Sequence, residues 1–372
     1  MNKTKMLIGA VVIFVAVGAV FMVQKGGGTS PESGVASIKI GAIYPLTGPA
    51  SSLGQEFRRG VEIAVQMLAS KQSPVMVAFE DSKTDPKAGM AAYQKLKSDN
   101  VNLLLTTVSS IALAIEPVAR QDGALLFADV GYPEITGKNP LLFRHSSTAE
   151  QEANVIYGYV LSEQQKLVAG IMWVNDDYGA AFIKEVERLN GKKPSGQELE
   201  IYSTSYLKAD SDLRSETAKI LDSHPDVVVV VGYGKSMGLA IRRIRESGFQ
   251  GKVIASMGFT VTPDAAATAG NAADGILYTR LDINESDEMF ANFSNQYKNR
   301  YGDSPPAFAV LAHNSASLLI KAASESGENP ENVAANILAR GHYIGAGEKM
   351  EITPSGDILP PVSLQKYTVT NQ

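Results

Sequence analysis

Two adjacent serines at the end of an apolar run are the first residues whose position suggests chemistry. Ser109 and Ser110 follow a strand-length apolar stretch, and helical spacing begins at Ile111. They are therefore expected at the carboxyl end of a strand and the amino end of a helix. Backbone N–H groups are unpaired there and the helix dipole favours an anion. Ligands of open α/β sheets bind at such strand ends, although Ser109 could instead be a simple helix N-cap.

A glycine-rich stretch at residues 232–238 follows a strand of five consecutive valines. Its spacing, Gly-x-Gly-x-x-x-Gly, is one residue longer than the dinucleotide fingerprint, and a phosphate loop would need glycine where the chain has Val229. Nucleotide binding is therefore not expected. The glycines indicate a close approach of the backbone to some other ligand, with Tyr233 directed at it.

Catalytic and metal-binding signatures are missing from the sequence. The four histidines lie far apart, at positions 145, 224, 313 and 342, and there is no cysteine. No nucleophile-elbow or paired-carboxylate signature stands out, and the adjacent Asp176 and Asp177 fit a solvated helix cap. We therefore expect no enzyme activity, no metal and no cofactor.

Length and charge narrow the class of protein further. The 372 residues suit two domains rather than one core, and the formal net charge is −5. No basic stripe is present, so nucleic acid is not an expected partner. The lack of cysteine excludes a disulfide framework and an acylated cysteine anchor.

The N-terminal segment has the features of an export signal. Lys3 and Lys5 precede an uncharged run of 18 residues, Met6–Val23, and a flexible glycine-rich linker follows at residues 26–37. The run is long for a signal core and close to the minimum for a membrane span. It can be a cleaved signal or a retained anchor. Either way, the folded part is expected on the periplasmic or extracellular face, with membrane contact only through this segment.

From Ile38 onward, strand-like and helix-like segments alternate in two successive series, residues 38–128 and 150–247. Such a series predicts two α/β lobes built on parallel sheets, with a cleft between them as the default site. Tyr132, Tyr178, Tyr233 and Phe259 fall in loops at strand ends. We expect these aromatic side chains to contact a ligand.

An ordered set of motifs resembles the leucine/isoleucine/valine-binding family of type I periplasmic solute-binding proteins. The segments that carry this resemblance, in chain order, are IKIG at 38–41, LTGPA at 46–50, Asp81 to Lys87, Ser109-Ser110, YPEIT at 132–136, Tyr178-Gly179, GYG at 232–234 and RESGF at 245–249. The likeness extends from about Ile38 to the C-terminus.

The resemblance implies two doubly wound parallel-sheet lobes that are joined by three crossovers and close on a ligand by hinge motion. By analogy, the first lobe comprises residues 38–145 plus 279–352 and the second 146–278 plus 353–372. The protein would deliver its solute to an ABC importer, with the transporter permease as partner. The expected ligand-binding residues are Leu53, Ser109, Ser110, Gly131, Tyr132, Tyr178, Tyr233, Phe259 and Phe308.

The sequence departs from the family at two positions where amino-acid binders hold the ligand: a threonine that helps to bind its carboxylate and a second-lobe acid that binds its amino group. The threonine of the loop after the fourth strand aligns with Val130-Gly131, and the second-lobe acid aligns with residues 256–259, which contain no carboxylate. A buried ammonium without a counter-charge costs several kcal/mol. Asp129 is the nearest replacement by sequence. The pattern therefore favours an apolar or aromatic carboxylate, or an amide, over a branched-chain amino acid. A membrane-tethered sensor is the alternative function.

Overall fold

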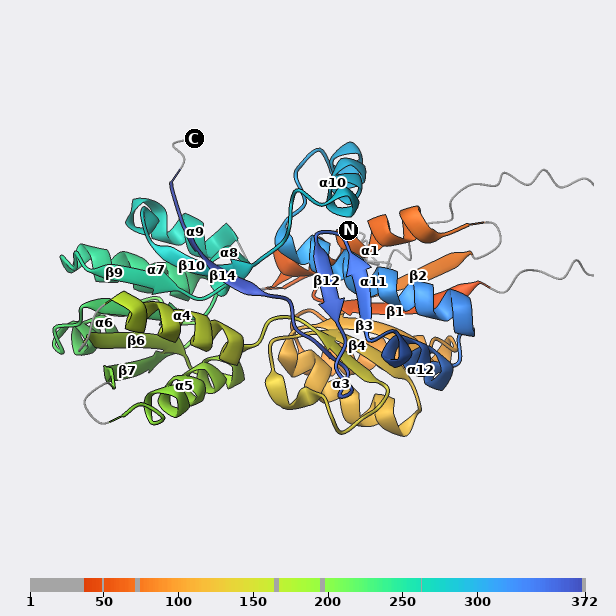
Figure 1. Cartoon of the computed structure of the whole chain (residues 1–372), viewed down its shortest axis with the longest axis horizontal. Helices are drawn as coiled ribbons and strands as arrows, with labels where there is room; N and C mark the ends of the chain where they lie inside the picture. The colour runs from red at the N-terminus through yellow and green to blue at the C-terminus, as the bar shows by residue number, and fades with distance from the viewer. Residues whose placement is uncertain are drawn as a thin grey trace, which may run out of the picture.

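A computed structural model describes residues 37–48, 50–70, 74–163, 167–194, 198–261 and 263–369. Within these residues the chain forms two lobes, each built on a six-stranded sheet (Figure 1). The strand orders are β13-β5-β4-β3-β1-β2 and β14-β10-β9-β8-β6-β7. The predicted α/β class with two doubly wound lobes is thereby confirmed.

The first sheet is parallel throughout. Its strands are β1 (Ile38–Tyr44), β2 (Val75–Asp81), β3 (Leu103–Thr107), β4 (Leu125–Asp129), β5 (Leu142–His145) and β13 (Asp357–Ile358). The helices of this lobe are α1 (Ser51–Leu68), α2 (Pro86–Ser98), α3 (Ser109–Gln121), α10 (Glu288–Tyr301), α11 (Ala307–Ser326) and α12 (Pro330–Arg340). A hairpin of β11 (His342–Gly345) and β12 (Glu348–Glu351) completes it.

The second sheet has the same winding, with one antiparallel edge strand. Its strands are β6 (Val168–Val174), β7 (Glu200–Tyr206), β8 (Val227–Val231), β9 (Lys252–Ala255), β10 (Leu277–Leu281) and β14 (Val362–Lys366). Its helices are α4 (Ala149–Glu163), α5 (Asp177–Asn190), α6 (Arg214–Leu221), α7 (Gly234–Glu246), α8 (Gly258–Val261) and α9 (Pro263–Ala269), followed by the short 3₁₀ turn η2 (Gly270–Ala273). The valine strand β8 is buried along its whole length, as the sequence predicts for a central strand.

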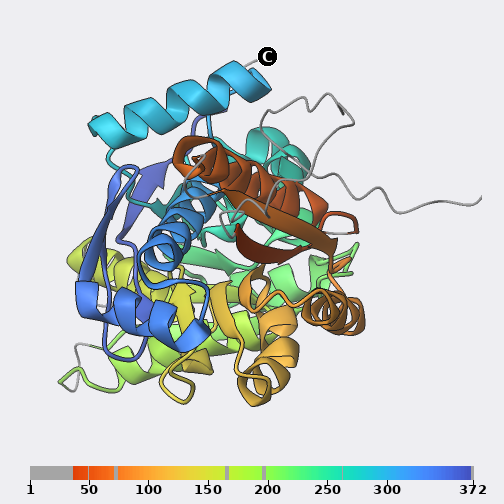
Figure 2. The ribbon, with the colours of Figure 1, turned by 90° about the vertical axis from the view of Figure 1, so that its right-hand side faces the viewer.

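Helices α1 and α11 cover one face of the first sheet and lie against each other, with α10 on the outside of α1 (Figure 2). Phe57, Val61 and Ala64 of α1 are buried, in agreement with the predicted apolar face. A Cβ atom at Gly60 would lie 2.2 Å from the carbonyl oxygen of Ala309. This contact shows that the two helix backbones touch, and only glycine fits at the crossing.

Three crossovers join the lobes, at residues 146–148, 282–287 and 359–361. The first directly follows β5, and the other two begin at different residues from those that analogy with the family implies. Strand β10 continues pairing in the second sheet as far as Leu281, and Asp357 pairs with Arg144 in the first sheet. Strand pairing thus places residues 279–281 in the second lobe and residues 353–358 in the first, the opposite of what analogy with the family implies.

Candidate ligand-binding site

The predicted serine loop lies where β3 ends and α3 begins. The N-cap of α3 is Val108, which makes no side-chain capping hydrogen bond, so Ser109 is the first helical residue and not the cap. The N–H groups of Ile111 and Ala112 both donate to the carbonyl of Val108, at 3.0 and 3.1 Å. Ser109 is half-buried and Ser110 is exposed. The helix therefore presents its first N–H groups and two hydroxyls without a capping side chain.

Val108 itself has an unusual backbone conformation, with φ 69° and ψ 114°. A positive φ is a genuine outlier for a β-branched residue and costs about 1–3 kcal/mol. Strain of this kind concentrates at binding sites, where the surrounding structure holds it in place. The strained residue immediately precedes the two serines, which marks this turn as a functional candidate.

The loop after β4 brings the first lobe toward the second. A Cβ atom at Gly131 would lie 3.4 Å from the carbonyl oxygen of Ser147 and 3.8 Å from the Tyr178 ring. Gly131 follows a first-lobe strand and Tyr178 lies on second-lobe helix α5, so two predicted site residues face each other between the lobes.

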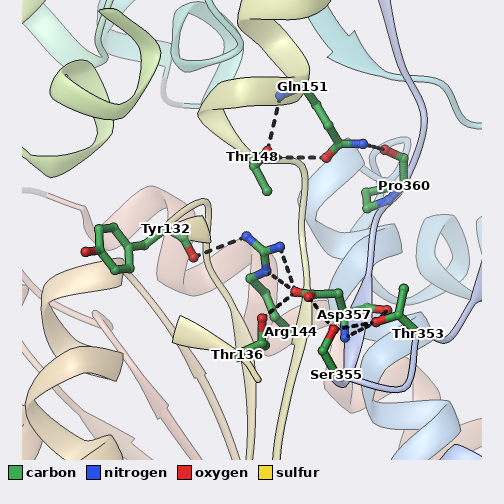
Figure 3. A network of polar contacts seen from close by, with 9 residues as sticks. All are labelled: Tyr132, Thr136, Arg144, Thr148, Gln151, Thr353, Ser355, Asp357 and Pro360. Atoms are coloured by element: carbon green, nitrogen blue, oxygen red, sulfur yellow. Dashed lines mark hydrogen bonds and ion pairs between the residues drawn. The ribbon is translucent and has the colours of Figure 1, made fainter. Parts of the chain in front are cut away.

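Tyr132 begins the short 3₁₀ turn η1 (Pro133–Ile135), and a buried ion pair holds its backbone. Arg144 donates to the Tyr132 carbonyl at 3.1 Å and pairs with Asp357 at 2.6 Å (Figure 3). Thr136 donates to the same Asp357 carboxylate at 2.8 Å. The ligand loop is thereby tied to β5 and β13, the strands that lead into the first and third crossovers. On the second-lobe side of the third crossover, Gln151 donates to the Pro360 carbonyl at 3.2 Å.

In the second lobe, both predicted tyrosines donate hydrogen bonds from their hydroxyl groups to carboxylates. Tyr178 donates to Glu152 at 2.7 Å, and Tyr233 donates to Asp176 at 2.5 Å. Burial and the neighbouring carboxylate charge raise the pKa of each tyrosine, so each hydroxyl keeps its proton. Asp176 also caps α5, as predicted, and pairs with Lys208 at 3.0 Å.

Glu152 is a site residue that sequence reasoning missed. It is 2% exposed, and it accepts hydrogen bonds from the Met257 backbone N–H at 2.7 Å, from the Thr279 hydroxyl and from Tyr178. Burial raises its pKa, and these three donors oppose the rise. Its position in the first turn of α4 gave no local signal, because its partners lie on α5, beyond β9 and on β10.

Three further predicted residues lie in packed surroundings. Phe259 is 0% exposed and meets Tyr367 edge-on, with ring centroids 4.9 Å apart, so its ring belongs to the second-lobe core and not to an accessible surface. Phe308 is half-buried, and the centroid of its ring lies 5.9 Å from that of Phe57. Leu53 is half-buried against the same first-lobe core. Tertiary packing thus removes the Phe259 ring from the predicted ligand surface in this conformation.

A buried polar cluster lies beneath the first-lobe strand ends. Ser315 donates to Asp129 at 2.6 Å and lies 2.8 Å from His145, whose other ring nitrogen is 3.0 Å from Glu348. Burial raises the pKa of Asp129 to about 7. Burial opposes protonation of His145, but the Glu348 and Asp129 carboxylates together outweigh burial and raise the pKa of His145. Ser315 is 0% exposed on α11, so this serine–histidine–acid arrangement offers no accessible nucleophile.

The described residues contain neither a candidate metal site nor a candidate membrane span. Within them, no group of three or more His, Asp or Glu side chains could hold a metal ion. None of their helices combines the length and apolar character of a membrane span. The predicted signal or anchor, Met6–Val23, lies outside the described residues.

Comparison with known proteins gives one consistent group. Residues 37–356 match the family described as periplasmic binding protein. A Leu/Ile/Val-binding protein homologue of Brucella melitensis is 26% identical over 251 residues, which are 66% of this chain and 67% of the relative.

Two solved structures share the fold. A branched-chain amino acid transporter substrate-binding protein of Streptococcus pneumoniae, in complex with isoleucine, aligns with TM-score 0.78 and 18% identity over 90% of this chain and 97% of its own. A solute-binding protein of an ABC transporter from Rhodopseudomonas palustris, in complex with 3,4-dihydroxybenzoic acid, aligns with TM-score 0.75 and 20% identity over 89% and 93%.

Proposed function

The chain belongs to the periplasmic binding protein family, and from that premise we propose that it captures a small carboxylate-bearing solute between its lobes and delivers it to an ABC importer. The observation that carries the choice of a carboxylate is the start of α3. Val108 caps this helix without a side-chain hydrogen bond, and Ser109 and Ser110 follow it directly. Free N–H groups, two hydroxyls and the positive end of the helix dipole together form an anion site.

The body of the proposed solute is apolar or aromatic. Tyr132, Tyr178 and Tyr233 follow strands β4, β6 and β8 in the chain and would offer large ring surfaces to such a solute. Isoleucine and 3,4-dihydroxybenzoate, the ligands of the two structural neighbours, share a carboxylate and such a body. Both chemical classes are therefore candidates for this chain.

The proposed role places the folded part outside the cytoplasm, with a transporter permease as partner. Closure of the lobes around a solute would be the signal that the permease recognises, because a ligand that contacts both lobes favours the closed state. Lys184 of α5 lies 3.6 Å from Glu134 in the first-lobe loop, an exposed pair that spans the two lobes. Met6–Val23 would serve as export signal or anchor.

A thermal-shift screen tests the proposal directly. The fragment from Ile38 is screened against branched-chain amino acids and against benzoate and its hydroxylated forms. We expect a carboxylate to raise the melting temperature of the wild type, and Ser109→Ala and Ser110→Ala to reduce that shift. Ser324→Ala, an exposed serine on α11, is the matched control and should keep it. Equal shifts in both serine variants and the control would refute the anion site.

A further inference from the structure

The second-lobe side of the site contains a buried carboxylate with no cation beside it. All three partners of Glu152 are neutral donors: the Met257 N–H and the hydroxyls of Thr279 and Tyr178. No basic side chain pairs with it in the part of the chain that the structure describes. Glu152 lies in the first turn of α4, where the helix dipole gives partial compensation. Burying a carboxylate without a counter-ion is costly. A solute that supplies a positive or hydrogen-bond-donating group nearby would offset part of that cost.

Tyr178 connects this carboxylate to the region between the lobes. Its hydroxyl donates to Glu152 at 2.7 Å, while its ring lies 3.8 Å from the Cβ position of Gly131 in the first-lobe ligand loop. A phenol has one proton to donate. The Tyr178 hydroxyl points its proton at Glu152 and also interacts with the Ser256 hydroxyl, so a solute could meet its oxygen only with a hydrogen-bond donor. A carboxylate on its other side increases the strength of that acceptor.

Tyr233 repeats the arrangement at the end of the neighbouring strand β8. Its only proton points to Asp176 at 2.5 Å, so toward any further partner its oxygen is also an acceptor. Here Lys208 balances the Asp176 charge at 3.0 Å, and its ammonium lies 4.9 Å from the centre of the Tyr233 ring. Asp176 beside Tyr233 thus has a cation next to it, whereas the Glu152 carboxyl group beside Tyr178 has none among the described residues.

We propose that the Tyr178–Glu152 pair is a specificity determinant that selects solutes carrying a hydrogen-bond donor in addition to their carboxylate. The carboxylate binds at Ser109 and Ser110 in the first lobe. The donor, an ammonium or a hydroxyl group, binds the Tyr178 oxygen in the second lobe. One solute then bridges both lobes through opposite chemistries, and Glu152 takes the place of the acid that is absent from residues 256–259.

This inference rests on the proposed carboxylate capture and can fail independently of it. The probes are two matched pairs: L-leucine with 4-methylpentanoate, and 3,4-dihydroxybenzoate with benzoate. The members of each pair differ only in the donor group. The pair that binds shows whether the donor is an ammonium or a hydroxyl group. In calorimetry the wild type should bind the donor-bearing member of one pair at least about tenfold more tightly, as expected for a hydrogen bond to a charge-assisted acceptor.

Variants of the pair test its mechanism. In Glu152→Gln, the amide NH2 can donate to the Tyr178 oxygen and release the phenol proton toward the solute, so the preference for the donor-bearing member should disappear. Tyr178→Phe keeps the ring, removes the acceptor and should have the same effect, and it carries the test if Glu152→Gln fails to fold. Glu185→Gln is the matched control, because Glu185 is a buried second-lobe acid that pairs with Arg188 and Asn154.

Each outcome decides the matter. Loss of preference in both variants, with the control unchanged, supports the inference. Tight binding of 4-methylpentanoate or benzoate by the wild type, equal to that of its partner, overturns it and leaves carboxylate capture intact. An unchanged preference in both variants also overturns it. Binding of none of the four probes would overturn carboxylate capture and this inference with it.

Discussion

His313 allows a quantitative prediction about the first lobe. The side chain lies on α11, is 5% exposed, and its ring centroid is 4.4 Å from that of Phe293. Its Nδ1 atom has no hydrogen-bond partner among the described residues. Burial lowers the pKa of His313 from 6.5 to about 3. The folded protein therefore keeps this imidazole neutral at pH values where an unfolded chain protonates it.

The sign of the stability effect follows from proton binding. Between pH 6.5 and about 3 the unfolded state binds more protons than the folded state at His313, so stability falls as the pH decreases. A pH of 5 lies 1.5 units below the pKa of 6.5 in the unfolded chain, so the imidazole is protonated there, whereas in the folded protein it is still neutral. At about 1.4 kcal/mol per unit, His313 should cost about 2 kcal/mol of stability between pH 7 and pH 5.

Replacing His313 with methionine, of similar volume but without a titrating group, isolates this contribution. Urea unfolding followed by circular dichroism gives the stability of the wild type and His313→Met at pH 7 and pH 5. The loss on acidification should be smaller by about 2 kcal/mol in the variant. His342→Gln, at an exposed histidine, should keep the wild-type loss. Equal losses in the wild type and His313→Met would refute the reasoning.

Three further substitutions test packing and positioning. Gly60→Ala should lower the free energy of unfolding by about 1–3 kcal/mol in urea titrations, because its Cβ would lie 2.2 Å from the Ala309 carbonyl oxygen. Arg144→Gln should destabilise by about 3 kcal/mol because it leaves the Asp357 carboxylate without its cation, and adding Asp357→Asn should recover part of the loss. Gly258→Ala should lower the melting temperature, because its Cβ would lie 1.8 Å from the carbonyl oxygen of Gly232. Since Gly232 precedes Tyr233, the substitution should also weaken binding of any carboxylate that stabilises the wild type. Unchanged values would contradict each contact.

Much of the architecture was predictable because it depends on local pattern. Alternating apolar strands and amphipathic helices predict two lobes built on mainly parallel sheets, and the structure confirms these two lobes. The junction of β3 and α3 at Ser109 follows from a change of period from strand to helix. The crossover positions were less predictable, since they depend on whether Leu281 and Asp357 find partners on neighbouring strands.

The finer chemistry of the candidate site depends on contacts between residues far apart in sequence. The cap at Val108 and the burial of Phe259 depend on backbone conformation and packing that neither residue type specifies. Glu152 meets Tyr178, Met257 and Thr279 only after α4, α5 and the second sheet have assembled.

The two-lobe fold, the family and the position of the serine loop could thus be predicted from the chain alone, because hydrophobic period and short motifs are properties of neighbouring residues. Which polar groups are buried, which carboxyl group lacks a neighbouring cation and where each tyrosine hydroxyl directs its hydrogen bond depend instead on the tertiary packing. Those properties arise from desolvation and from hydrogen-bond partners that long-range packing brings together.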